Sequence, residues 1–287
     1  MPDSRSAVET PSGKHAGYEN FPVGSWLLPA RLRPHILTFY HFARAIDDIA
    51  DSPTLSVMEK TERLGMFAEV LKNGTPVAGY EKAMAMSESL AATGVTSQHC
   101  LDLITAFRQD TCQNRYKNWD ALMAYCMLSA APVGRYLMDL NGGGTDGYHP
   151  SDALCCALQI INHVQDCGDD YDTLDRVYLP QDWMREHSAV VPMLGCKETS
   201  PELRRVLDRL LDATDQLLDT SRCLPSGLKS RRLGMEAAFI QRIAEALSRE
   251  LRQDDPLANR MSIGPIRYGV CGLLGLFDCL FHSRQMP

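Results

Sequence analysis

The chain has 287 residues, of which 45% are hydrophobic and 23% charged, and its formal net charge at pH 7 is −7. The acidic balance argues against a nucleic-acid partner, because nucleic acid is met by a basic face. The length allows a large apolar core, and since no linker interrupts it we expect a single domain over residues 18–287. Residues 1–17 are polar and hold two prolines, so we expect a disordered leader there rather than a signal peptide.

The ten cysteines are scattered along the chain, and no two of them form a Cys-x-x-Cys pair. Most lie in apolar windows with the helical period, where a free cysteine behaves as a small buried hydrophobe. We therefore expect free thiols and a reducing, cytoplasmic location rather than a disulfide framework.

The segment 19–28 separates the leader from the first strong helical pattern. Its side chains Asn20, Phe21 and Ser25 either line a site or dock the terminus, and taken alone they favour docking. The helix itself is expected to begin at Pro34, because proline is well tolerated in the first turn of a helix.

A first acidic line lies in residues 39–51, which read FYHFARAIDDIAD. Four of its positions recur at steps of three and four residues and so share one face of a helix: Tyr40, Arg44, Asp47 or Asp48, and Asp51. Arg44 also stands one turn before Asp48, and the alternative is therefore a local salt bridge within the helix. Negative charge near a helix C-terminus is unfavourable, which argues that a positively charged ligand meets these aspartates.

Further helical windows follow along the chain. They cover residues 56–71, 80–92, 97–110 and 119–140. The last window contains SAAPVG, and because a proline in mid-helix removes a hydrogen bond we expect a bend at Pro132. Residues 141–150 read as a loop, and Ser151 is the expected N-cap of the next helix.

A second acidic line lies in residues 150–180, which read as one long helix and the turn that leaves it. Four polar side chains run through it at steps of three, four and four residues: Gln159, Asn162, Asp166 and Asp170. Buried carboxylates without a partner are very costly, so a positive group must meet them. Carboxylate and amide oxygens with no His or Cys pair favour Mg²⁺ over zinc or copper. His163 is expected to be packed, and Asp169 to stand behind the line.

The rest of the chain reads as helices and connecting segments. Residues 186–200 are expected to connect, and helices are expected from Pro201, over residues 227–250 and from Pro256 onward. The apolar run 266–281 is too short for a membrane span and is interrupted by charge, so we expect a core helix and leave peripheral membrane contact open. No stretch alternates with the strand period for long, and the predicted fold class is all-α.

The two acidic lines resemble the signatures of the squalene and phytoene synthase family of head-to-head prenyl synthases. The first signature is YHFARAIDDIAD at 40–51, and the second is QIINHVQDCGDDYDTLDRVYLP at 159–180, about 120 residues further on. Their order and spacing make the resemblance specific, and it covers nearly the whole chain from about Tyr18. It implies the all-α isoprenoid synthase fold, a helical bundle with a central cavity.

The resemblance also implies the residues of the site. Two or three Mg²⁺ ions would be held by Asp47, Asp51, Asn162, Asp166 and Asp170. Diphosphate contacts would come from Arg44, Arg176 and Tyr178. The prenyl pocket would be formed by Phe21, Tyr40, Tyr125 and Gln159, with Asn20 and Gln165 as further substrate-binding residues. Catalytic roles would fall to Asp47, Asp51, Asp166, Asp170, Tyr40 and Arg44.

Three stretches most resemble the branch of the family that serves the bacterial hopanoid pathway: residues 18–23, residues 115–135, and Gln165 directly before Asp166. Condensing members usually carry Arg at the position of Gln165, and a V-A-G-x-V-G-like run where this chain has SAAPVG. Two departures point the other way. Ala131 stands where that branch commonly has Asn, and the CGDD after Asp166 looks closer to the condensing members.

In the favoured interpretation the substrate is presqualene diphosphate, which ionises with Mg²⁺, rearranges as a carbocation and is quenched by water to hydroxysqualene. Ring faces around the cation are expected from Phe21, Phe39, Tyr40, Phe42 and Tyr125. No Gly-x-Gly-x-x-Gly follows a strand pattern, so no nicotinamide cofactor is expected. Action beside other hopanoid-pathway enzymes is implied. The alternatives are condensation of two farnesyl diphosphates to presqualene diphosphate, and a non-catalytic partner that binds prenyl diphosphate.

Overall fold

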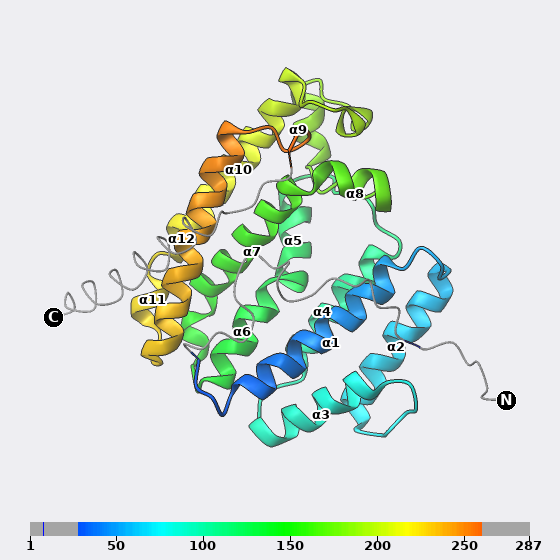
Figure 1. Cartoon of the computed structure of the whole chain (residues 1–287), viewed down its shortest axis with the longest axis vertical. Helices are drawn as coiled ribbons and strands as arrows, with labels where there is room; N and C mark the ends of the chain where they lie inside the picture. The colour runs from blue at the N-terminus through cyan, green and yellow to red at the C-terminus, as the bar shows by residue number, and fades with distance from the viewer. Residues whose placement is uncertain (1–7, 9–27, 260–287) are drawn as a thin grey trace. The chain divides into compact units, whose positions relative to one another are not determined.

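The computed structural model describes Val8 and residues 28–259 (Figure 1). Within these residues every regular element is a helix, apart from one isolated bridge between Arg115 and Val177, so the all-α prediction is confirmed. The described chain forms two compact units, one ending at Gln113 and the other beginning at Asn114. That the two units form one domain stays a prediction. The predictions on Asn20, Phe21, Ser25 and the last helix lie outside the described residues.

The first unit consists of four helices, α1 Arg33–Asp51, α2 Val57–Asn73, α3 Glu81–Thr93 and α4 Gln98–Asp110. Helix α1 has Pro34 in its first turn, within one residue of the predicted start. Helix α2 starts with a capping box, in which the Ser56 hydroxyl accepts from the Glu59 N–H and the Glu59 carboxylate accepts from the Ser56 N–H. It ends at Gly74, whose φ of 65° favours glycine.

The core of the first unit is built on the apolar face of α1. Helix α1 packs on α2, α3 and α4, and Phe42, Ile46 and Ile49 are fully buried in it. The Phe42 ring meets Phe67 of α2 edge to face, with 5.8 Å between centroids. Phe42, expected among the rings around a cation, therefore belongs to this core.

The second unit is larger and surrounds one helix. Its elements are α5 Trp119–Ser129, α6 Ala131–Leu140, η2 Thr145–Gly147, α7 Tyr148–Gln165, α8 Cys167–Leu174, α9 Gln181–Glu186, η3 Val191–Gly195, α10 Pro201–Ser221, α11 Leu224–Gly227 and α12 Arg231–Gln253. Helix α7 packs on α5, α6, α10 and α12 (Figure 1). Most of the residues before its last turn are buried, which makes α7 the centre of the unit.

The bend expected in SAAPVG is a break between two helices. Helix α5 ends at Ser129, Ala130 leaves the helical conformation with φ −120° and ψ −48°, and α6 starts with Pro132 in its first turn. Beyond the break, α6 lies so close to α7 that a Cβ on Gly134 would collide with the side chains of Ser151 and Cys155. Ser151 is thus buried inside α7, and its prediction as an N-cap is wrong because the helix begins three residues earlier.

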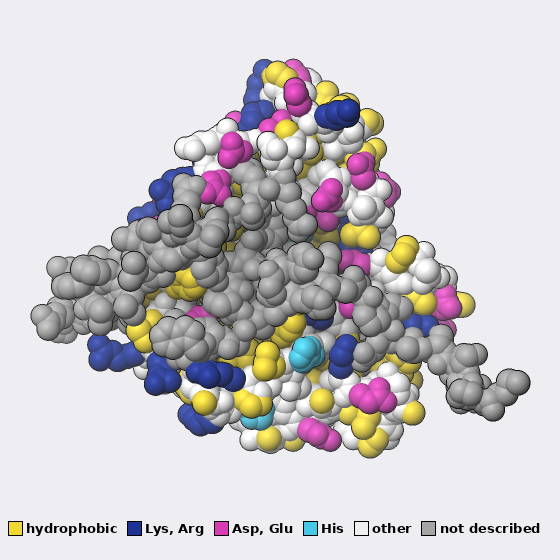
Figure 2. Space-filling model, viewed as in Figure 1, with side chains coloured by type: hydrophobic (Ala, Val, Ile, Leu, Met, Phe, Trp, Pro, Cys, Tyr) yellow, Lys and Arg dark blue, Asp and Glu magenta, His cyan; other side chains and the backbone are white. Residues whose placement is uncertain are grey.

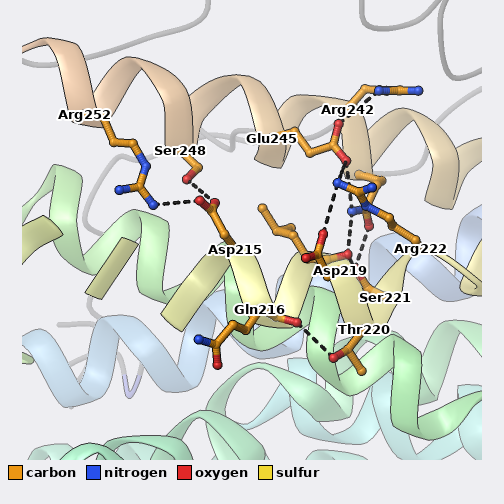
Figure 3. Close-up of polar contacts among 12 residues, drawn as sticks. Asp215, Gln216, Asp219, Thr220, Ser221, Arg222, Arg242, Glu245, Ser248 and Arg252 are labelled. Atoms are coloured by element: carbon orange, nitrogen blue, oxygen red, sulfur yellow. Dashed lines mark hydrogen bonds and ion pairs between the residues drawn. The ribbon is translucent and has the colours of Figure 1, made fainter. Parts of the chain in front are cut away.

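Helices α10 and α12 are joined by a polar seam beside their leucine-rich faces. Asp215 accepts hydrogen bonds from the Ser248 hydroxyl at 2.8 Å and from Arg252 at 2.6 Å (Figure 3). Further along, the Ser221 hydroxyl bonds to the Gln241 side chain at 2.6 Å. Helix α10 begins as predicted, with Ser200 as N-cap and Pro201 in the first turn.

Two tryptophans stack near the start of α5. The rings of Trp119 and Trp183 lie 5.5 Å apart with 9° between their planes, and the Arg209 guanidinium lies 4.3 Å from the Trp183 centroid. Trp183 belongs to α9, a helix that the sequence analysis did not predict. All cysteines in the described part of the chain are free thiols, as expected.

Candidate active site

The first acidic line occupies the last turns of α1. Arg44 donates to Asp47 at 2.6 Å and to Asp48 at 3.0 Å, so one guanidinium neutralises two consecutive carboxylates. The three side chains are between 12% and 23% exposed, which leaves them partly open to a ligand. The local salt bridge considered for Arg44 is therefore present.

Tyr40 and Asp51 complete this line at its two ends. Both are half-buried, and Asp51 is the last residue of α1. Phe39, beside Tyr40, is only 4% exposed. The four residues expected on one face of this helix thus share it at half-buried positions, between the buried apolar side chains.

The second acidic line spans two helices rather than one. Helix α7 ends at Gln165, Asp166 has φ −102° and ψ 11°, and α8 follows directly. The helical hydrogen bonds nevertheless continue across the break. Asp166 N–H donates to the Asn162 carbonyl at 2.9 Å, and Asp170 N–H donates to the Asp166 carbonyl at 2.8 Å. The prediction of one long helix is wrong, yet the one-turn spacing of the three oxygen-bearing side chains is kept. Asp169 is exposed, away from this half-buried line.

Two polar residues that lie between members of this line on α7 are buried. His163 is 6% and Gln165 8% exposed. Burial, and next the nearby positive charge of Arg176, lower the pKa of His163 to about 3, so its imidazole is neutral at physiological pH. Its Nε2 lies 3.3 Å from the Gln159 amide nitrogen. His163 is a packed residue, as expected.

An aromatic cluster lies against this part of α7. We use this name for Tyr116, Tyr125, His163 and Tyr178. The Tyr178 ring stacks on His163 with 3.6 Å between centroids and 11° between planes, and it lies 5.6 Å from Tyr125 and 5.7 Å from Tyr116. All four side chains are buried. Tyr125 and Tyr178 were expected at the site, whereas Tyr116 was missed because it precedes α5 and belongs to no helical pattern.

The chain after α8 turns back and runs beside residues 114–117. Asp175 adopts the left-handed conformation with φ 50°, and Arg176 N–H then reaches the Asp170 carbonyl at 3.1 Å. Three backbone bonds follow: Val177 N–H to the Asn114 carbonyl at 2.9 Å, Gln181 N–H to the Tyr116 carbonyl at 2.9 Å, and Asp182 N–H to the Lys117 carbonyl at 3.1 Å. We call this paired segment the backbone ladder 114–117/177–182.

A side-chain ion pair closes the end of the ladder. Arg115 donates to the Asp175 carboxylate at 2.5 Å and also to the Asp175 carbonyl, while the Asn114 amide donates to the same carboxylate at 3.3 Å. The hydrogen bond from Arg115 is the main reason why the pKa of Asp175 lies below its usual value. Arg176, the next residue, is 7% exposed.

The donors of the two lines suit Mg²⁺ bound together with phosphate. No group of three or more His, Cys, Asp or Glu close enough to hold a metal ion occurs among residues 28–259. Each line instead offers carboxylates one helical turn apart, and the second adds the Asn162 amide. Because Mg²⁺ usually takes one or two carboxylates and completes its shell with water and substrate phosphate, this donor set fits.

The surface of the second unit carries one basic patch, which we define as Lys229, Arg231 and Arg232. All three side chains are exposed, at or just before the start of α12. Figure 2 shows Lys and Arg side chains in the part of the view where Figure 1 draws α11. No helix in the described part of the chain carries an apolar stretch long enough to cross a bilayer.

Comparisons with known proteins agree on one family. The family described as squalene/phytoene synthase matches residues 14–267. A hydroxysqualene synthase of Rhodopseudomonas palustris is 44% identical over 264 residues, which are 92% of this chain and 89% of the relative. One from Zymomonas mobilis is 41% identical, over 89% of this chain and 86% of the relative.

Solved structures share the fold. A squalene synthase from Alicyclobacillus acidocaldarius is 30% identical with a TM-score of 0.73, over 82% of this chain and 89% of that one. A dehydrosqualene synthase, 20% identical, superposes with a TM-score of 0.76 over 90% of each chain. The expected isoprenoid synthase fold is thereby confirmed.

Proposed function

This chain belongs to the squalene/phytoene synthase family, and from that premise we propose that it converts presqualene diphosphate to hydroxysqualene. It is an enzyme of that family. The observation that carries the proposal is the similarity, along most of the chain, to relatives named hydroxysqualene synthase. The buried Gln165 supports it, because it stands where condensing members usually carry Arg.

The reaction begins when the bond between carbon and the diphosphate oxygen breaks and the electron pair leaves with the diphosphate. Bound Mg²⁺ stabilises the negative charge that develops on the leaving group. In the proposal, Asp47, Asp51, Asn162, Asp166 and Asp170 hold the metal. Arg44 and Arg176 bind the diphosphate oxygens, since a guanidinium is suited to paired hydrogen bonds with phosphate.

The carbocation that remains needs a surround without nucleophiles or positive charge. Tyr125 and Tyr178 supply ring faces whose quadrupoles attract a cation. His163 stacks on Tyr178 and is neutral at working pH, so it adds no repulsive charge beside the cation. After rearrangement, a water oxygen forms the new bond to carbon and loses one proton to solvent, which balances the step without a hydride donor.

Particular residues weigh for or against the two alternative functions. Condensation of two farnesyl diphosphates is favoured by the CGDD sequence and opposed by Gln165, which has donors but no charge for a second diphosphate. A non-catalytic partner that only binds prenyl diphosphate is opposed by the presence of both carboxylates in each acidic line.

The deciding experiment is a product assay with purified protein, Mg²⁺ and either presqualene or farnesyl diphosphate in ¹⁸O-water. We expect presqualene diphosphate to be consumed far faster, and the product to be an alcohol whose oxygen carries the label. Unlabelled product, or presqualene diphosphate that accumulates from farnesyl diphosphate, would assign the condensing reaction instead.

Substrate and product are C30 lipids, so exchange with a membrane surface is part of the proposal. The basic patch provides three exposed cations, and each such cation is worth about 1 kcal/mol near an anionic leaflet. Contact is proposed to be peripheral, on the cytoplasmic side, beside other enzymes of the hopanoid pathway.

A further inference from the structure

The turn after α8 holds two proposed site residues in place, and its own conformation needs support. Asp175 has φ 50°, in the left-handed region where residues other than glycine are uncommon. Aspartate is among those that tolerate it, because a short polar side chain can be held by local hydrogen bonds. Here the Asp175 carboxylate and carbonyl are both held by Arg115. The ion pair therefore fixes the turn.

The turn ends α8 and ties the next residue to it. Arg176 N–H donates to the main-chain carbonyl of Asp170, so the residue that carries the guanidinium is held through the backbone to the last residue of the acidic line. From Val177 onward the ladder 114–117/177–182 aligns the chain with residues 114–117, which stacks Tyr178 on Tyr116 within the aromatic cluster. One conformation at Asp175 thus sets the position of both residues.

The exposure of the pair argues against a role in stability. The Asp175 side chain is 68% and the Arg115 side chain 30% exposed. Ion pairs so open to solvent contribute little to folding, because water and salt screen them. The same pair can still select the backbone conformation of Asp175, because Asp175 itself is exposed although the residues that follow it are buried.

We propose that Arg115 and Asp175 are positioning residues for diphosphate binding. Their ion pair holds the turn that brings Arg176 to Asp170 and Tyr178 into the aromatic cluster. The inference deepens the proposed function and rests on it for the role of Arg176. Neither residue is proposed to touch the substrate, so loss of the pair should weaken the binding of diphosphate rather than remove a reacting group.

The test uses the full chain, Mg²⁺ and inorganic diphosphate as the probe, with affinity measured by titration calorimetry. Amide hydrogen exchange of the peptide that covers residues 175–182 reports the ladder independently of binding. We expect Arg115→Gln and Asp175→Ala to weaken Mg²⁺–diphosphate binding about tenfold and to speed exchange at the Val177 and Gln181 amides. Melting temperatures should stay close to that of the wild type.

Two variants of Asp175 separate the charge from the backbone. Asp175→Gly keeps the left-handed turn accessible without a side chain, and Asp175→Asn keeps an acceptor without charge. We expect both to lose affinity by less than Asp175→Ala does. They also keep the test decisive if the alanine variant folds poorly.

The chain offers a matched control in Arg252 and Asp212. This ion pair lies in the same unit, its side chains are also 30% and 68% exposed, and its N–O distance is 2.9 Å. Asp212→Ala, which matches Asp175→Ala and leaves the Arg252–Asp215 pair of the seam in place, should change neither diphosphate affinity nor exchange over residues 175–182.

The outcomes separate the inference from the proposed function. Faster exchange with unchanged affinity would overturn the inference, and so would unchanged exchange and affinity together. If the wild type binds Mg²⁺–diphosphate but makes no hydroxysqualene, the proposed reaction fails while the positioning role is still measured. A wild type that binds no diphosphate would overturn both.

Discussion

The two acidic lines have similar spacing but obtain their positive charge in different ways. In α1 the cation is internal, since Arg44 lies three and four residues before the carboxylates that it bridges. In α7 and α8 the nearest proposed cation, Arg176, comes from beyond a chain reversal and is tied to Asp170 through the backbone. The first line is therefore set by helical spacing alone, whereas the second depends on a turn and on residues 114–117.

This difference predicts how each line responds to change. A line neutralised within its own helix keeps its geometry when distant residues change. A line whose cation arrives through a ladder can lose its ligand-binding geometry without unfolding. The following experiments use the contrast, from the largest expected effect to the smallest.

Removal of one carboxylate should have the largest effect on turnover. We expect Asp47→Asn and Asp166→Asn to lower kcat by about 10²–10³ or more, the loss typical when one group that stabilises developing charge is removed. Folding should be retained in both variants. Asp166→Asn relieves repulsion in an acidic segment, and Asp47→Asn loses one partly exposed ion pair while Arg44 keeps its pair with Asp48. Asp169→Asn, an exposed neighbour outside the line, is the matched control. Equal loss in the control, or unfolding of Asp166→Asn, would point to a structural role.

The double variant Asp47→Asn with Asp166→Asn tests whether the two lines serve one reaction step. If both hold metal for the same diphosphate, the double variant should lose far less than the product of the single effects. The measurement is steady-state kinetics of all four proteins at saturating Mg²⁺. Fully multiplicative losses would indicate that the lines act independently.

Replacement of Gln165 by Arg would give the second acidic line a positive charge within its own helix, as Arg44 does for the first. Gln165→Arg adds a fixed positive charge next to Asp166, as in condensing members. We expect turnover of presqualene diphosphate to fall about tenfold, because a cation beside the carbocation costs about 1.4 kcal/mol or more in the transition state. The product assay with both diphosphates measures this. Gln165→Glu, which adds the opposite charge, should not reproduce the tenfold fall in turnover of presqualene diphosphate.

Removal of Arg44 tests the internal neutralisation of α1. Arg44→Gln leaves Asp47 and Asp48 without their shared cation, so we expect a loss of about 0.5–1 kcal/mol in the free energy of unfolding without Mg²⁺. Added Mg²⁺ should restore more stability to this variant than to the wild type, since binding to the folded state stabilises it. Thermal unfolding with and without Mg²⁺ gives the answer. Identical Mg²⁺ shifts in both proteins would contradict it.

The smallest expected effect concerns the basic patch, which is far from either line in sequence. Replacing Lys229, Arg231 and Arg232 by Gln should reduce sedimentation with anionic phosphatidylglycerol vesicles severalfold, and leave turnover in detergent unchanged. High salt should reduce wild-type sedimentation to the same level. Binding that survives both changes would place the membrane contact elsewhere on the chain.

Local signals predicted the parts of the fold that local chemistry decides. The helix starts expected near residue 56 and at Pro201 are correct to within a residue, and the proline in SAAPVG marked the break between α5 and α6. The spacing of the second acidic line is also as predicted, because helical hydrogen bonds continue through Asp166. The break between α7 and α8 was not predicted, since no proline or glycine stands at Asp166.

The features that the sequence did not predict, Tyr116 in the aromatic cluster and helix α9, depend on contacts between distant segments. Tyr116 belongs to the aromatic cluster because residues 114–117 pair with the chain after α8. No pattern in RYKNW, residues 115–119, predicts that pairing. Helix α9 has only six residues, and its first two N–H groups, which have no acceptor within the helix, bond to the carbonyls of Tyr116 and Lys117.

The stacked tryptophans give the second unit an optical reporter of its own. Trp119 begins α5 and Trp183 lies just beyond the ladder, so their stacking depends on the same alignment that places Tyr178. An indole partner and the Arg209 guanidinium over the Trp183 ring both alter its emission. The chain has three tryptophans in all. A shift in tryptophan emission on adding Mg²⁺ and diphosphate would therefore report a change in the stacking of Trp119 and Trp183 in real time, without a label.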